Sequence, residues 1–115
     1  MRHWLAAAAL SVLFLAPPGA ALSQRTYAGE EAAALRCANT LALTAVALWR
    51  AGMIEEAEKE VMLEITILIL ERHVSGTWAQ KKTAMAIMRD RRSVPDTLED
   101  YQKNAARCLR QFPIN

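Results

Sequence analysis

The chain is poor in the residues from which most catalytic and metal sites are built. Its 115 residues include two cysteines, two histidines, four glycines and four prolines. It contains no Cys-x-x-Cys pair, glycine-rich phosphate loop, dinucleotide-binding fingerprint or calcium-binding loop. Because nucleophilic and zinc sites need suitably spaced histidines or thiolates, the sequence predicts a protein that is not an enzyme and that has no metal or cofactor.

The acidic and histidine residues do not alter this interpretation. His73 follows Arg72 at the expected end of a helix, where a cation interacts favourably with the helix dipole. A di-iron bundle needs Glu-x-x-His on two helices, whereas Glu71 and His73 are separated by one residue. Four glutamates are predicted to form a solvated helix face: Glu56, Glu60, Glu64 and Glu71.

Aromatic residues and net charge are also low, at 6% and +2. The charge is uneven, because residues 24–71 carry eight glutamates against four basic residues, while residues 72–115 carry nine basic against four acidic ones. The basic residues are not interleaved with aromatic side chains on which bases stack, so we expect no nucleic-acid partner.

What the chain does have is a long apolar start. Trp4 to Ala16 is apolar, follows the basic Arg2, and precedes Pro17-Pro18-Gly19. This order is typical of a secretory signal peptide, and the run is short for a membrane span. We expect residues 1–23 to be a cleaved signal peptide, with an uncleaved membrane anchor as the alternative.

The remaining residues, 24–115, are predicted to form one helical domain. Cleavage is expected before Leu22 or Gln24, and no later apolar run reaches about 18 residues. The mature chain is therefore predicted to lack a transmembrane segment and to be periplasmic or secreted.

Both cysteines, Cys37 and Cys108, belong to the mature chain. An even pair in an oxidising compartment indicates one disulfide, with free thiols or metal ligands as alternatives. The bond is expected to be structural, and to stabilise the fold by about 4 kcal/mol in the chain-entropy model.

Hydrophobic periodicity predicts four helices. The first runs from about Gly29 to Ala51 and is stopped by Gly52, and the second from about Met53 or Ile54 to Val74. In the third, Thr77 and Gln80 form a capping box before a helix that ends near Arg91 or Arg92. The fourth begins near Pro95 and ends before Pro113.

Each helix has an expected buried face. The first is rich in alanine beside Cys37 and Leu41; the third uses Ala84, Met85, Ile87 and Met88; the fourth uses Leu98, Tyr101, Ala105, Cys108 and Phe112. The second has two apolar stripes, one of Ile54, Ala57, Val61, Ile65 and Leu68 and one of Leu63, Ile67, Leu70 and Val74. Residues 65–70 alone also resemble a strand, but the helical spacing around them favours a helix.

The two cysteines lie on apolar stripes near the start of the first helix and the end of the fourth, which meet at one end of an up-down-up-down bundle. The sequence therefore predicts an all-α fold: a small antiparallel four-helix bundle with one disulfide, preceded by a cleaved signal peptide.

Two surface features are the candidate sites. Apolar residues in excess of one buried face form a possible interface of Leu43, Val46, Ile67, Ile69 and Leu70. A possible basic patch of Lys81, Lys82, Arg89 and Arg92 shares the third helix with Trp78. The patch has three interpretations: contact with an acidic partner, contact with anionic lipid heads, or an ordinary solvated face.

These features favour a protein-interaction module, either a homodimer or a chain that binds an unknown protein partner. The alternative is a carrier of a small apolar ligand, with an interior cavity lined by Met85, Met88, Ile67 and Leu70. An exposed apolar surface supports the module, and a closed surface over a large internal cavity supports the carrier.

Overall fold

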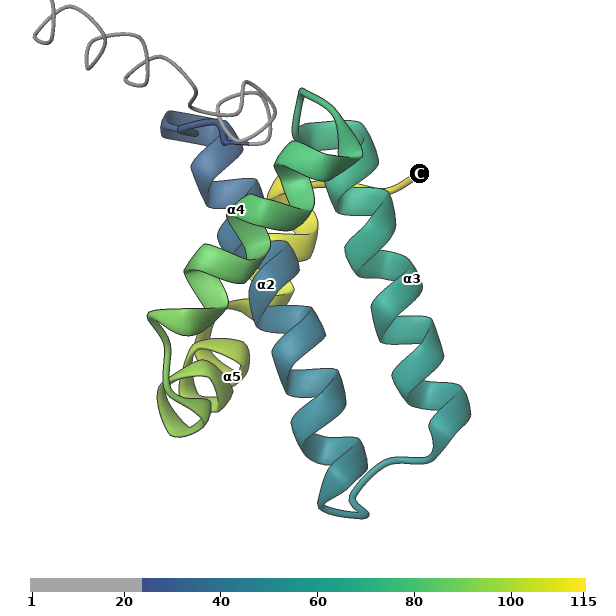
Figure 1. Cartoon of the computed structure of the whole chain (residues 1–115). Helices are drawn as coiled ribbons and strands as arrows, with labels where there is room; N and C mark the ends of the chain where they lie inside the picture. Colours follow the sequence, from purple (N-terminus) through teal and green to yellow (C-terminus); the bar gives the residue numbers. More distant parts are fainter. Residues whose placement is uncertain (1–23) are drawn as a thin grey trace, which may run out of the picture.

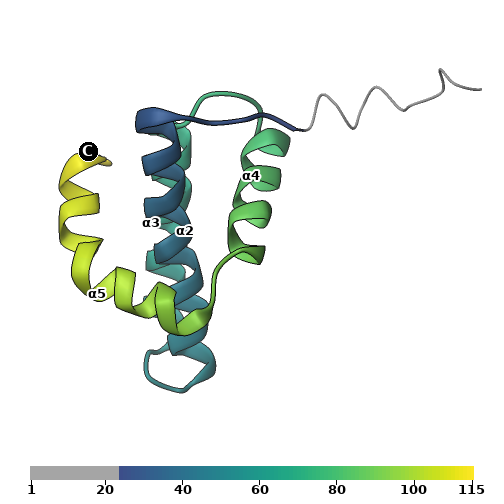
Figure 2. The same ribbon diagram turned by 90° about the vertical axis from the view of Figure 1, so that its left-hand side faces the viewer.

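The computed structural model describes residues 24–115, so the predicted signal peptide lies outside the described residues. These residues form four α-helices and no strand, which confirms the all-α prediction. The helices are α2 (Gly29–Arg50), α3 (Glu56–His73), α4 (Trp78–Asp90) and α5 (Val94–Gln111). α2, α3 and α4 alternate in direction (Figure 1), and α5 first crosses beside α2 and then turns toward the C-terminus (Figure 2).

The central element is α2, because each of the other helices packs against it. α3 makes the most extensive contact, followed by α5 and then α4. α4 and α5 lie on opposite sides of α2 (Figure 2), and contacts among α3, α4 and α5 are sparse. The arrangement is therefore organised around one helix, with open spaces between its neighbours.

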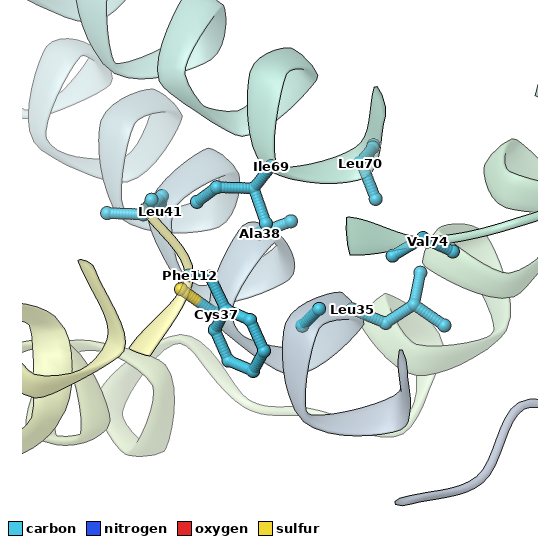
Figure 3. Close-up of a cluster of buried hydrophobic side chains, with 9 residues drawn as sticks. Leu35, Cys37, Ala38, Leu41, Ile69, Leu70, Val74 and Phe112 are labelled. Atoms are coloured by element: carbon cyan, nitrogen blue, oxygen red, sulfur yellow. The ribbon is translucent and has the colours of Figure 1, made fainter. Parts of the chain in front are cut away.

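α2 is suited to this position by its small buried residues. Ala34, Ala38 and Ala45 are completely buried, and Leu35 and Leu41 are nearly so. The small side chain of alanine lets a neighbouring helix approach the backbone of α2 closely, whereas a leucine in the same place would hold that helix further away. Figure 3 shows Leu35, Ala38 and Leu41 of α2 with Ile69 and Leu70 of α3 in this core.

The disulfide joins α2 to α5, as predicted. Cys37 and Cys108 are bonded with a Cα–Cα distance of 5.7 Å and a sequence separation of 71 residues. The neighbouring Phe112 is 4% exposed in the same core. A disulfide of this kind is typical of proteins in oxidising compartments outside the cytoplasm.

Local signals place most helix ends where the sequence predicts them. Gly52 follows α2 with a φ of +72°, the left-handed conformation that suits glycine after a helix. Thr77 and Gln80 form the expected capping box of α4. α3 begins later than predicted, at Glu56, because Glu55 is its N-cap and shares a capping box with Glu58.

The buried face of α3 differs from the prediction. Val61 is 53% exposed, whereas Thr66 and Ile69 are buried against α2. The Thr66 hydroxyl donates to the carbonyl oxygen of Met62 at 2.9 Å and lies 3.5 Å from that of Ala38. A polar residue is therefore accommodated at the centre of the face because its hydrogen bond is satisfied.

One residue expected in the core of α4 is also displaced. Ile87 is 40% exposed, while Ala84, Met85 and Met88 pack at the edge of the core. α4 contacts only α2 extensively, so it has a narrower buried face than a helix with two packed neighbours.

Candidate functional site

The predicted interface residues do not share one surface. Ile69 is completely buried and Leu70 is 6% exposed, so the prediction that they form an outward-facing interface is wrong. Both belong to the α2–α3 core because α3 turns that side toward α2. Ile67, by contrast, is 50% exposed. Leu43 and Val46 are half-buried.

Leu43 and Val46 line an open groove with a volume of about 550 Å³. It lies between α2, α3 and α4, where the shorter α4 leaves part of α2 uncovered. We call it the α2–α3–α4 groove; its lining residues are Asn39, Ala42, Leu43, Val46, Arg50, Leu63, Leu70, Lys82, Met85, Ala86 and Arg89. Its floor is apolar and three basic side chains stand along it.

The predicted basic patch is divided by the structure. Lys82 and Arg89 are exposed, and both line the groove. The half-buried Leu43 and Val46 line the same groove. Lys81, expected in the same patch, is only 6% exposed. Its ammonium group lies 4.7 Å from the centroid of the Trp78 ring, so the aliphatic stem is covered and the charge is held by the ring face.

Arg92 is the other member of the patch that the structure removes from the surface. Its side chain is 13% exposed and points into a polar network between α2 and α5. Nη1 donates to Oγ1 of Thr40 at 2.8 Å and to Oδ1 of Asn39 at 3.3 Å. Nη2 donates to Oδ2 of Asp100 at 2.7 Å. Burial of the guanidinium is possible because a carboxylate and two polar groups pair with it.

Asp100 is the acidic centre of this network. It accepts hydrogen bonds from Arg36 at 3.1 Å, Thr40 at 3.0 Å and Asn104 at 2.6 Å, besides that from Arg92. Burial by itself raises the pKa of this carboxyl. The hydrogen bonds from Asn104, Arg36 and Thr40, with the charge of Arg36, outweigh burial and lower the pKa to about 2.

The sequence gives little warning of this network. Asn39 and Thr40 are 2% and 5% exposed, although they lie in the alanine-rich face of α2. Neither residue belongs to the apolar stripes predicted for this helix, so hydrophobic periodicity gives no signal of their burial. Asn39 also donates to the carbonyl oxygen of Met85 at 3.1 Å, which ties α4 to α2 at the end of the groove.

His73 contacts the C-terminal residues of the chain. Its Nε2 lies 2.7 Å from the carbonyl oxygen of Pro113, and its ring meets that of Phe112 edge-on at 5.4 Å between centroids. It therefore fastens the C-terminal residues to the end of α3. Within residues 24–115, no group of three or more His, Cys, Asp or Glu side chains is placed to hold a metal ion.

The four residues expected to line an interior cavity are dispersed. Met85 and Leu70 line the groove, Met88 lines a different surface cleft, and Ile67 is exposed. Among the described residues, the four side chains therefore do not enclose one cavity.

α2 is the one described helix whose length and composition would allow it to cross a membrane, and half of its most apolar window is buried inside the fold. Central helices of soluble folds have the same properties. The contacts of α2 with all three other helices are those of such a core helix.

Comparison with known proteins gives no family assignment: no family model, curated protein or solved structure matches the chain. The surfaces of the molecule itself therefore carry the functional inference.

Proposed function

We propose that the protein is an exported interaction module, periplasmic or secreted, that works by binding and not by catalysis. Its binding site is the α2–α3–α4 groove, and its partner is a second copy of the same chain. The observation that carries the proposal is the apolar groove with basic residues along it, next to an acidic face of α3.

The acidic face of α3 has the chemistry to fill such a groove. Glu60, Glu64, Ile67 and Glu71 follow one another at helical spacing and are all exposed. They form what we call the α3 ridge, in which Ile67 is flanked by carboxylates. The groove offers the complementary set, Arg50, Lys82 and Arg89 around Leu43, Val46 and Met85.

The charges on both surfaces are available for a partner. Within residues 24–115, Glu64 and Glu71 of the ridge and Arg50 and Lys82 of the groove form no ion pair. Charged groups along an interface steer association and fix its register more than they add affinity. Insertion of Ile67 into the apolar floor provides the hydrophobic part of the contact.

The positions of ridge and groove fit a two-fold axis. Leu63 and Leu70 line the groove, and Ile67 lies between them, four residues after Leu63 and three before Leu70. The ridge is therefore next to the wall of the groove. A two-fold rotation places each ridge in the groove of the other copy, so both copies bury the same surface.

The test is the mass of the processed protein in solution, measured by light scattering at micromolar concentration. We expect twice the mass of one chain, and a single-chain mass for Ile67→Glu. Ile67 is half-exposed, so this substitution leaves the core intact; Ile69→Glu would place a charge in the core instead.

Charge reversal tests whether the α3 ridge and the α2–α3–α4 groove are the surfaces that meet in the dimer. We expect Glu64→Lys/Glu71→Lys to give monomers, and the further changes Arg50→Glu/Lys82→Glu in the same chain to restore the dimer. Glu99→Lys, an exposed reversal on α5, is the matched control and should leave the mass unchanged. A wild-type chain that stays monomeric, whether free or bound to another protein, overturns the self-association.

A further inference from the structure

A second cleft, separate from the α2–α3–α4 groove, is lined on one side by four arginine residues. It has a volume of about 620 Å³ and lies between residues 25–27, the first half of α2 and the end of α4. Arg25, Arg36, Arg91 and Arg92 all line it, and no acidic residue of the described chain does. We call it the arginine cleft.

The other wall of the cleft is apolar. The buried Leu35 of α2, the partly buried Met88 of α4 and the exposed Ile87 line this wall. Ile87, which the narrow buried face of α4 leaves exposed, therefore lies in the wall of the cleft. A cleft with convergent polar groups on an apolar lining is the usual form of a small-molecule site.

The arginines keep donors free for a ligand. A guanidinium group has five N–H donors. Arg36 binds Asp100 through its Nε and its side chain is 65% exposed, so the donors of its two terminal nitrogens are left for a ligand. Arg91 forms no ion pair within residues 24–115.

Two of the four side chains are held in place. Arg92 is fixed by Asn39, Thr40 and Asp100. Arg25 lies 5.0 Å from the centroid of the Tyr27 ring, whose hydroxyl donates to the carbonyl oxygen of Ser75 at 2.8 Å. The carboxylates that form ion pairs with these arginines are Asp100, bound by Arg36 and Arg92, and Glu31, 3.9 Å from Arg25. Four cations against two carboxylates leave the cleft positive.

We propose that the arginine cleft binds an amphiphilic anion, a molecule with one acidic head and an aliphatic chain. The arginines hold the head through bidentate, charge-assisted hydrogen bonds, and Leu35, Ile87 and Met88 cover the first carbons of the chain. The site is independent of the groove and of self-association, because Lys82, Arg50 and the α3 ridge do not line it.

The probe is decanoate, titrated calorimetrically below its micelle concentration into the processed protein. Two ligands separate the contributions of head and chain. Butyrate has the same head with a short chain, and decyltrimethylammonium has the same chain with a positive head. We expect decanoate to bind saturably, and both comparison ligands to bind at least about tenfold more weakly.

Variants then locate the site. Arg91→Glu should weaken decanoate binding by at least about tenfold, because it places a like charge beside the head. Arg110→Glu, the same charge change on the exposed side of α5, should leave it within about twofold. Both residues are exposed, and an unchanged melting temperature checks that the fold is intact.

Three results would overturn the proposal: equal binding of the cationic and anionic decyl compounds, equal effects of the two arginine variants, or no binding of decanoate. Anionic phospholipids carry similar acidic heads in a membrane, so flotation with anionic phospholipid vesicles is run in parallel. Vesicle binding without decanoate binding would assign the cleft to a lipid surface and would also overturn the proposal.

Discussion

At the scale of single residues, the least expected feature is the polar network around Asp100. One carboxylate holds two arginines, from α2 and from the α4–α5 connection, together with Thr40 of α2 and Asn104 of α5. Periodicity marks which positions are apolar, but it does not say which polar residues will find partners inside. For that reason the sequence predicts a surface position for Arg92, whereas the structure buries it.

The network predicts how the protein responds to acid. The pKa of Asp100 is about 2 in the folded chain against a usual value of 3.8, so the carboxylate stabilises the fold above pH 4. That stability, about 2 kcal/mol, is lost as the pH falls from about 4 to 2. Chemical unfolding at several pH values should show a smaller pH dependence for Asp100→Asn than for the wild type, and lower stability at pH 6. Parallel curves for the two proteins would contradict this role.

At the scale of elements, the sequence predicts the helix ends more accurately than the buried helix faces. The capping box of Thr77 and Gln80 and the stop at Gly52 are local, so a few residues determine them. The face of α3 is not local. Its residues 65–70 are apolar in nearly every direction, and only the position of α2 decides that Ile69 is buried and Ile67 is not.

The connection between α3 and α4 is a more constrained element than the one between α2 and α3. Gly76 and Gly52 both have positive φ, at +96° and +72°. A Cβ on Gly76 would lie 2.6 Å from Oε1 of Gln80 and 2.9 Å from the Tyr27 hydroxyl, whereas one on Gly52 would meet nothing within 4 Å. Both contacted atoms already form hydrogen bonds that hold the connection.

We therefore expect unequal effects of the same substitution. Gly52→Ala should lower the free energy of unfolding by about 1 kcal/mol, the conformational cost of alanine in the left-handed region. Gly76→Ala should lower it by about 2–3 kcal/mol, because the methyl group also displaces part of the α4 cap. Denaturant unfolding of the two variants measures the difference. Equal losses of unfolding free energy in the two variants would show that the α3–α4 connection accommodates the methyl group without disturbing the N-cap of α4.

At the scale of the whole molecule, the disulfide and the all-α architecture follow from the sequence, while the open spaces do not. The two cysteines lie on predicted apolar stripes near the same end of the bundle, so pairing and packing support each other. The groove and the arginine cleft depend on α4 being short and packing almost only on α2. Hydrophobic periodicity in the sequence does not predict the distance between two packed helices.

The disulfide should contribute much of the stability of so small a fold. Closing the loop between Cys37 and Cys108 is expected to stabilise it by about 4 kcal/mol. Cys108→Ser, and reduction of the wild type, should lower the free energy of unfolding by similar amounts in denaturant titrations. Thiol titration of the denatured, unreduced wild type should find no free thiol. Two free thiols in exported protein would contradict the assignment.

The central position of α2 also determines where the chain tolerates change. Ala34, Ala38 and Ala45 are completely buried at the places where other helices approach. A larger side chain at any of them pushes a whole helix outward, and glycine there weakens α2 itself. The outer faces of α3, α4 and α5 have no comparable restriction, since each faces solvent. Substitutions during evolution are therefore more restricted at these alanine positions of α2 than on the outer faces of the helices that surround it.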